Sequence, residues 1–138
     1  MKKIEHIGIA VRDISAANKT YEALLGTTHY KSETVESEGV ETSFFHIGES
    51  KIELLAATSE DSVIQKFLDK KGEGLHHIAF LVENIEKEIN RLQSEGFTLL
   101  NEKPKKGADN KLIAFLHPKS SNGVLVELCQ ERNSDSDK

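Results

Sequence analysis

Apolar and polar residues alternate at the start of the chain, and this alternation predicts a strand over residues 4–11. Ile7, Ile9 and Val11 would lie on one face of that strand, because successive side chains of a strand point to opposite sides. His6 would lie on the other face, together with two small residues. The strand therefore has one bulky apolar face and one open face that carries a histidine.

A helical spacing follows, and three more strands complete the first half of the chain. Asp13 is a candidate N-cap and Gly26 a candidate C-cap for a helix between them. The apolar stripe of this helix repeats every three or four residues, at Ile14, Ala17, Tyr21, Leu24 and Leu25. Strands are predicted near residues 27–32, 42–47 and 51–56. The first half has the order βαβββ.

The second half repeats this order. It begins with a strand over 75–82, continues with a helix from Asn84 to Gly96, and ends with strands near 98–101, 112–116 and 123–130. The predicted fold is α+β: paired βαβββ modules that form an eight-stranded, cupped (half-barrel) mixed sheet around a metal site. We expect one domain over 1–138, with module one at about 1–57, a connecting helix at about 58–72, module two at about 73–131 and a frayed tail at 132–138.

The repeat is also visible in the residues. Lys3-Ile4-Glu5-His6-Ile7-Gly8-Ile9-Ala10-Val11 returns as Gly74-Leu75-His76-His77-Ile78-Ala79-Phe80-Leu81-Val82, and Lys51-Ile52-Glu53-Leu54-Leu55 returns as Leu125-Val126-Glu127-Leu128-Cys129. His6 thus has a counterpart in His77, and Glu53 has one in Glu127. Both glutamates interrupt apolar strands, where an unpaired carboxylate costs several kcal/mol and needs a lysine, an arginine or a metal as its partner.

The same pattern in both halves favours a metal site made of His6, Glu53, His77 and Glu127. Imidazole nitrogen and carboxylate oxygen suit a divalent ion such as Co, Mn, Ni or Zn, and the two carboxylates offset its charge. Four protein ligands leave two positions open on an ion that takes six. A substrate with two neighbouring oxygens could fill them, and the ion would then act as a Lewis acid toward an enolate.

The remaining histidines and basic residues lack this pattern. We expect His76 either to contact a metal-ligating residue without binding the metal or to be structural, His29 and His46 to lie at the surface, and His117 to begin a turn. A cluster of lysines leaves room for an anionic part of a ligand, at Lys103, Lys105, Lys106, Lys111 and Lys119.

Composition excludes several classes of partner. A formal net charge of −5 argues against nucleic acid as the main partner. No apolar run approaches the roughly 20 residues that cross a bilayer, and no apolar segment follows the first lysines as it would in a signal peptide. We therefore expect a cytoplasmic protein without membrane partners. Its one cysteine, Cys129, cannot form an internal disulfide and is expected to be a small buried side chain.

Three motifs resemble the methylmalonyl-CoA epimerase family within the vicinal oxygen chelate superfamily, which includes glyoxalases, bleomycin resistance proteins and dioxygenases. They are Gly74-Leu75-His76-His77-Ile78-Ala79-Phe80, Phe115-Leu116-His117-Pro118-Lys119 and Gly123-Val124-Leu125-Val126-Glu127-Leu128. The superfamily resemblance covers residues 1 to about 131. It implies paired βαβββ modules around one metal ion.

The resemblance also implies an activity. The family interconverts (2R)- and (2S)-methylmalonyl-CoA in propionate metabolism by a 1,1-proton transfer through an enolate that the metal stabilises. It implies that Glu127 is both a metal ligand and the base, and that the second catalytic glutamate follows a Gly-Val pair, where Glu41 is the candidate. The implied partners are an acyl-CoA substrate and a second copy of the chain in a homodimer.

Three other functions remain open at this point. His6, Glu53, His77 and Glu127 are equally the ligand set of bacterial glyoxalase I, whereas the His-Pro-Lys turn favours the epimerase. A non-catalytic drug-binding protein of the same superfamily would often lack a complete ligand set. An extradiol dioxygenase would use iron with two histidines and one carboxylate, in a longer chain.

Overall fold

The computed structural model describes residues 1–132, which form two compact units. The N-terminal unit is His6–His76, and the C-terminal unit combines Met1–Glu5 with the described residues from His77 onward. The first half of the chain contains β1 (Lys3–Ala10), α1 (Ile14–Leu25), β2 (Lys31–Val35), the 3-10 helix η1 (Glu36–Glu38), β3 (Val40–Ile47), β4 (Ser50–Ala57) and α2 (Val63–Lys71). The second half contains β5 (Gly74–Leu81), α3 (Ile85–Ser94), β6 (Lys105–Lys106), β7 (Lys111–Leu116), the 3-10 helix η2 (Pro118–Ser121) and β8 (Val126–Glu131).

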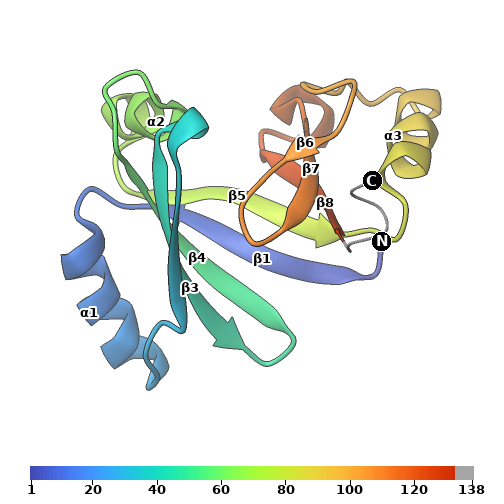
Figure 1. Cartoon of the computed structure of the whole chain (residues 1–138). Coiled ribbons are helices and arrows are strands. Elements are labelled where there is room, and N and C mark those ends of the chain that lie inside the picture. The colour runs from blue at the N-terminus through green and yellow to red at the C-terminus, as the bar shows by residue number, and fades with distance from the viewer. Residues whose placement is uncertain (133–138) are drawn as a thin grey trace. The chain divides into compact units, whose positions relative to one another are not determined.

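Four strands of the N-terminal unit lie in the order β2-β3-β4-β1 (Figure 1). The β2/β3 and β3/β4 pairs are antiparallel, whereas β1 and β4 are parallel. Helix α1 covers one face of these strands, where its apolar residues pack against a buried cluster: Val11, Phe45, Leu54 and Ala56. Helix α2 packs at one end of the opposite face, against Ala10 and Leu55.

The caps of α1 are those that the sequence predicts. The Asp13 side chain accepts a hydrogen bond from the Ala16 backbone N–H at 3.0 Å. Gly26 ends the helix with a φ of 71°, a left-handed conformation that favours glycine. The predicted burial of Leu24 is wrong, because this side chain is 70% exposed. Leu24 and Leu25 are neighbours on the helix, and the sheet lies against Leu25.

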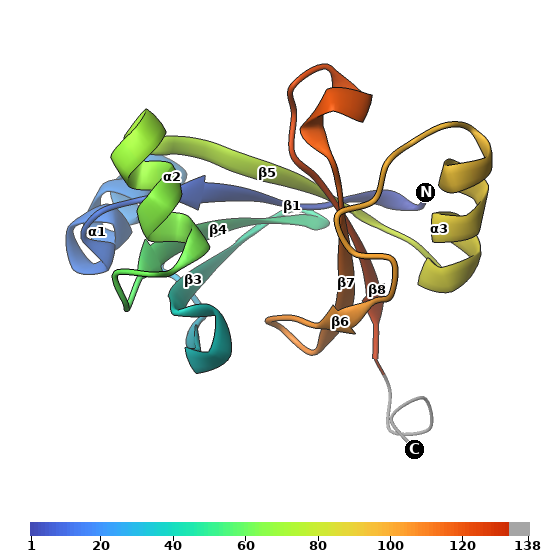
Figure 2. The same ribbon diagram turned by 90° about the horizontal axis from the view of Figure 1, so that it is seen from above.

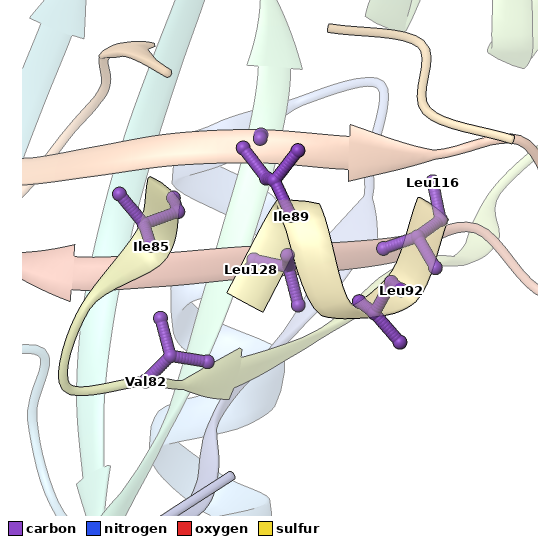
Figure 3. Close-up of a cluster of buried hydrophobic side chains, with 7 residues drawn as sticks. Val82, Ile85, Ile89, Leu92, Leu116 and Leu128 are labelled. Atoms are coloured by element: carbon purple, nitrogen blue, oxygen red, sulfur yellow. The ribbon is translucent and has the colours of Figure 1, made fainter. Parts of the chain in front are cut away.

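The C-terminal unit places β8 between β5 and β7, and β6 pairs with the far side of β7 (Figure 2). The β5/β8 pair is parallel, and the β7/β8 and β6/β7 pairs are antiparallel. Helix α3 begins after Asn84, whose side chain accepts from the Lys87 N–H at 3.0 Å. Its apolar stripe covers one face of the strands (Figure 3), in a cluster of Val82, Ile85, Ile89, Leu92, Ala114, Leu116 and Leu128.

The edge strands differ from the predicted ones. The strand expected near 27–32 lies at Lys31–Val35, and the segment 98–101 contributes only an isolated bridge from Leu99 to Leu116. The partner of β7 is instead the two-residue strand β6. Asp109 and Asn110 make this hairpin possible, because both adopt positive φ (57° and 55°) in the connection.

Two connections also shorten predicted elements. Helix α2 begins at Val63, later than the predicted 58, because Ser62 caps it by accepting from the Gln65 N–H at 3.0 Å. Strand β8 begins at Val126 rather than at 123, because η2 and the turn after it occupy the preceding residues. Of the tail predicted to fray, residues 133–138 lie outside the described part of the chain.

The predicted α+β class, the repeated βαβββ order and the mixed pairing of eight strands are confirmed within residues 1–132. In the same part of the chain, no helix is long and apolar enough to cross a membrane.

Two leucines on helices provide a test of the C-terminal core. Leu92 on α3 is 5% exposed and Leu24 on α1 is 70% exposed. Leu92→Ala should lower the free energy of unfolding by about 2–5 kcal/mol, because it leaves a cavity in the α3 cluster. Leu24→Ala, the matched control, should change it by less than about 0.5 kcal/mol. Urea denaturation measures both, and equal losses would contradict this packing.

Candidate metal and proton-transfer site

The first histidine and carboxylate lie on the face of the N-terminal unit that α1 leaves uncovered. In the parallel β1/β4 ladder His6 is the partner of Lys51, and Gly8 is the partner of Glu53. His6 and Glu53 therefore share a face, opposite Leu54 and the α1 cluster. His6 Nδ1 lies 3.1 Å from Glu53 Oε2, with only 5% and 6% of the two side chains exposed.

The C-terminal unit contains an equivalent pair. Glu127 on β8 is the partner of Ala79 on β5 and of Phe115 on β7. His77 Nε2 lies 3.3 Å from Glu127 Oε1, and both side chains are buried to the same extent as the first pair. The Phe115 ring packs edge-on against the His77 imidazole, with 5.8 Å between their centroids. Both functional side chains lie opposite the α3 cluster, which contains Leu128.

Each pair has the spacing that a shared metal ion requires. Two atoms that each lie about 2.1 Å from a metal, at a right angle, are about 3 Å apart. The His6–Glu53 and His77–Glu127 distances, 3.1 and 3.3 Å, fit this value. The 3.1 Å distance also suits a hydrogen bond between imidazole and carboxylate. The donor set therefore fits a divalent ion with nitrogen and oxygen ligands, and a bound cation would offset the cost of burying each carboxylate.

The predicted second base lies on the other side of its strand. Glu53 pairs with Phe44 across β3/β4, whereas Glu41 pairs with Ala56. Directly opposed residues point to the same side of a sheet. Glu41 therefore shares the face that α1 covers, away from His6 and Glu53, and this register does not support a role in proton transfer. The buried β3 residue next to Phe44 on the site face is Thr42.

Two aromatic residues beside the site were not predicted from the sequence. Phe44 lies directly opposite Glu53, and Phe115 lies directly opposite Glu127. Both are the strand neighbours of a carboxylate, so their rings lie beside it on the same face of the sheet. Their positions beside the glutamates follow from the pairing register of the strands, which the spacing of residues along the sequence does not predict.

The other histidines have structural surroundings. His76 packs edge-on against Phe67 of α2, with 4.9 Å between centroids. His29 Nδ1 lies 2.9 Å from Glu22 Oε2, and His46 is exposed and stacks on Tyr30. His117 caps η2, since its Nδ1 accepts from the Lys119 N–H at 3.1 Å.

Lys111 is buried, whereas Lys103, Lys106 and Lys119 of its cluster are exposed and Lys105 is half-buried. It is 5% exposed, and its Nζ lies 3.4 Å from Asp109 Oδ2 and 3.8 Å from Glu131 Oε1. Its charge is balanced within the hairpin, so it contributes little to an anion site.

Comparison with known proteins identifies relatives that match nearly the whole chain. Residues 5–115 match the family model of the Glyoxalase/Bleomycin resistance protein/Dioxygenase superfamily. The chain is 43% identical to the uncharacterized protein YqjC of Bacillus subtilis, over 96% of this chain and 94% of that protein. It is 40% identical to the ethylmalonyl-CoA/methylmalonyl-CoA epimerase of Cereibacter sphaeroides, over 93% and 97% of the two chains.

A solved structure extends this similarity to the fold. A single-substitution variant of the Streptomyces coelicolor methylmalonyl-CoA epimerase, in complex with 2-nitronate-propionyl-CoA, superimposes with a TM-score of 0.90. The two chains are 36% identical, and the match covers 95% of each.

His76 gives a pH-dependent test of its structural role. Burial lowers its pKa from 6.5 to about 4, so the unfolded chain binds a proton between these values that the folded chain excludes. In metal-free protein His76 should therefore contribute a fall of about 2–3 kcal/mol to the free energy of unfolding as the pH drops from 7 to 4. His76→Phe should flatten this part of the profile, while the exposed control His46→Gln should retain it. Urea titrations at several pH values measure the free energy of unfolding. If its pH dependence in His76→Phe equals that of the wild type, the lowered pKa of His76 is contradicted.

Proposed function

Because the chain belongs to the glyoxalase/bleomycin resistance/dioxygenase superfamily, we propose that it is a metal-dependent methylmalonyl-CoA epimerase. The proposed reaction is a 1,1-proton transfer that interconverts (2R)- and (2S)-methylmalonyl-CoA. The observation that carries the proposal is the pair of buried histidine–glutamate contacts, one in each unit and both on strands. The relatives named as epimerases support the choice of substrate.

In this proposal one divalent ion is held by all four residues of the two pairs: His6, Glu53, His77 and Glu127. When bound, the ion would supply Lewis acidity toward the two oxygens that flank C2 of the substrate. The carboxylates of Glu53 and Glu127 balance the charge of the ion. Rigid strands hold all four side chains, and the aromatic neighbours Phe44 and Phe115 limit the access of water.

Glu127 is the proposed base. A carboxylate has two oxygens, so Glu127 can remain a ligand through one oxygen while the other receives the C2 proton. As the C2–H bond breaks, its electron pair delocalises toward the thioester carbonyl and an O–H bond forms on Glu127. Return of that proton to carbon restores the carboxylate. His77 orients Glu127, because their side chains lie 3.3 Å apart.

Metal binding tests the proposed ligands. Glu53→Gln removes a negative ligand, so the affinity for Co²⁺, measured by isothermal titration calorimetry, should fall at least about tenfold. Glu60→Gln is the matched control, because Glu60 is an exposed glutamate of the same unit outside its strands. Its affinity should stay within about twofold of wild type. Full affinity in Glu53→Gln would remove this residue from the ligand set.

Isotope exchange tests the base. In D₂O with Co²⁺, the protein should introduce deuterium at C2 of methylmalonyl-CoA, as measured by mass spectrometry against a protein-free blank. Glu127→Gln should slow this exchange at least about 100-fold, because general-base catalysis contributes about 10²–10⁴. Glu131→Gln, on the same strand and largely exposed, should retain the wild-type rate. A glyoxalase assay on the same preparation separates the runner-up activity, and turnover in that assay without C2 exchange would overturn the epimerase proposal.

A further inference from the structure

A row of residues crosses the site face of the N-terminal unit, which is the face that holds His6 and Glu53. Lys51 on β4 is the partner of His6 on β1 and of His46 on β3, so the three side chains share this face. Neighbouring strands lie about 4.8 Å apart, so the backbone at His46 is about 10 Å from that at His6. The site face thus continues from the histidine–glutamate pair to a second histidine.

An aromatic surface lies at the β3 end of this row. The Tyr30 ring stacks on the His46 imidazole, with 3.8 Å between their centroids and 9° between their planes. The same ring lies 6.1 Å from that of Phe44, which is fully buried directly opposite Glu53. Tyr30 is 40% exposed, and His46 is exposed as well. The three rings therefore form a series that is buried beside Glu53 and accessible to a ligand at Tyr30 and His46.

Two lysines accompany these rings on the same face. Lys51 occupies the middle of the row and is half-buried. Lys31 on β2 is the partner of Phe44, and its Nζ lies 4.8 Å from the centroid of that ring. Glu33 Oε1, 3.7 Å from Lys31 Nζ, offsets part of the charge of Lys31 only. Stacked rings beside lysines suit a ligand that combines a planar base with phosphate groups.

We infer that Tyr30 and His46, together with Lys51, bind the nucleotide part of a coenzyme A thioester whose acyl end lies at His6 and Glu53. The inference rests on the proposed function, which supplies the acyl end. The pantetheine arm is long enough to cross the roughly 10 Å between these positions. The adenine ring then stacks on the exposed rings, and Lys51 offsets charge on the phosphates. Glutathione has no planar base, so this surface favours an acyl-CoA over the substrate of a glyoxalase.

Binding of coenzyme A to the metal-free protein provides the first test, because this binding does not depend on catalysis. In isothermal titration calorimetry His46→Ala should weaken the affinity at least about fivefold, through the lost stacking partner. Ile47→Ala is the matched control, because Ile47 is the next residue of β3, is 41% exposed and points to the opposite face. Its affinity should stay within about twofold of wild type, as should that of Tyr30→Phe, which keeps the ring. Equal affinities in His46→Ala and Ile47→Ala overturn the inference, as does a wild-type protein that binds coenzyme A no more tightly than glutathione.

A truncated substrate provides the second test. Exchange at C2 in D₂O with Co²⁺ is measured for methylmalonyl-CoA and for methylmalonyl-pantetheine, which lacks the nucleotide. The wild-type KM should be at least about fivefold lower for the CoA thioester, and His46→Ala should narrow this difference at least about threefold by raising that KM alone. An equal rise of KM for both thioesters would place the contact on the pantetheine arm and overturn the inference. Absence of exchange with either thioester would instead overturn the proposed function, and calorimetry would still decide the nucleotide contact.

Discussion

Burial of two carboxylates in apolar strands is the constraint on which the site depends. Glu53 and Glu127 are both 5% exposed, and each lies between residues that pack into a core. A buried charge without compensation costs several kcal/mol, which is a large part of the stability of a typical domain. Each glutamate has a histidine nitrogen within 3.1–3.3 Å of a carboxylate oxygen. A cation bound at these positions would offset part of that cost.

The two faces of the strands have different roles: one packs into a core and the other carries the candidate site. In the N-terminal unit Leu54 packs under α1, while its neighbour Glu53 points to the other side. In the C-terminal unit Leu128 packs under α3, while its neighbour Glu127 points away from that helix. Along each strand, one residue thus packs into the core and its neighbour belongs to the candidate site. Because strand side chains alternate strictly, the apolar packing on one face also fixes the aim of the functional residues on the other.

Local signals in the sequence predicted most of the fold. Caps at Asp13 and Asn84 and the apolar stripe of α3 depend on residues close together in the chain, and these predictions are confirmed. The edge strand β6 and the face of Glu41 depend on contacts between distant segments. Two residues in left-handed conformation, Asp109 and Asn110, make the β6/β7 hairpin, and a close approach of Gly39 to Ser59 sets the register of β3. The spacing of residues along the sequence predicts neither the β6/β7 hairpin nor the register of β3.

The N-terminal unit shows why a ligand set alone does not define a reaction. His6 and Glu53 repeat the residue types of His77 and Glu127, and each histidine–glutamate pair lies within its own unit. The side chain that β3 presents to the face of His6 and Glu53 depends on a shift of one position, because Glu41 and Thr42 are adjacent in sequence but lie on opposite faces. The register of β3, which begins directly after Gly39, thus decides that a hydroxyl rather than a carboxylate lies on the face of His6 and Glu53.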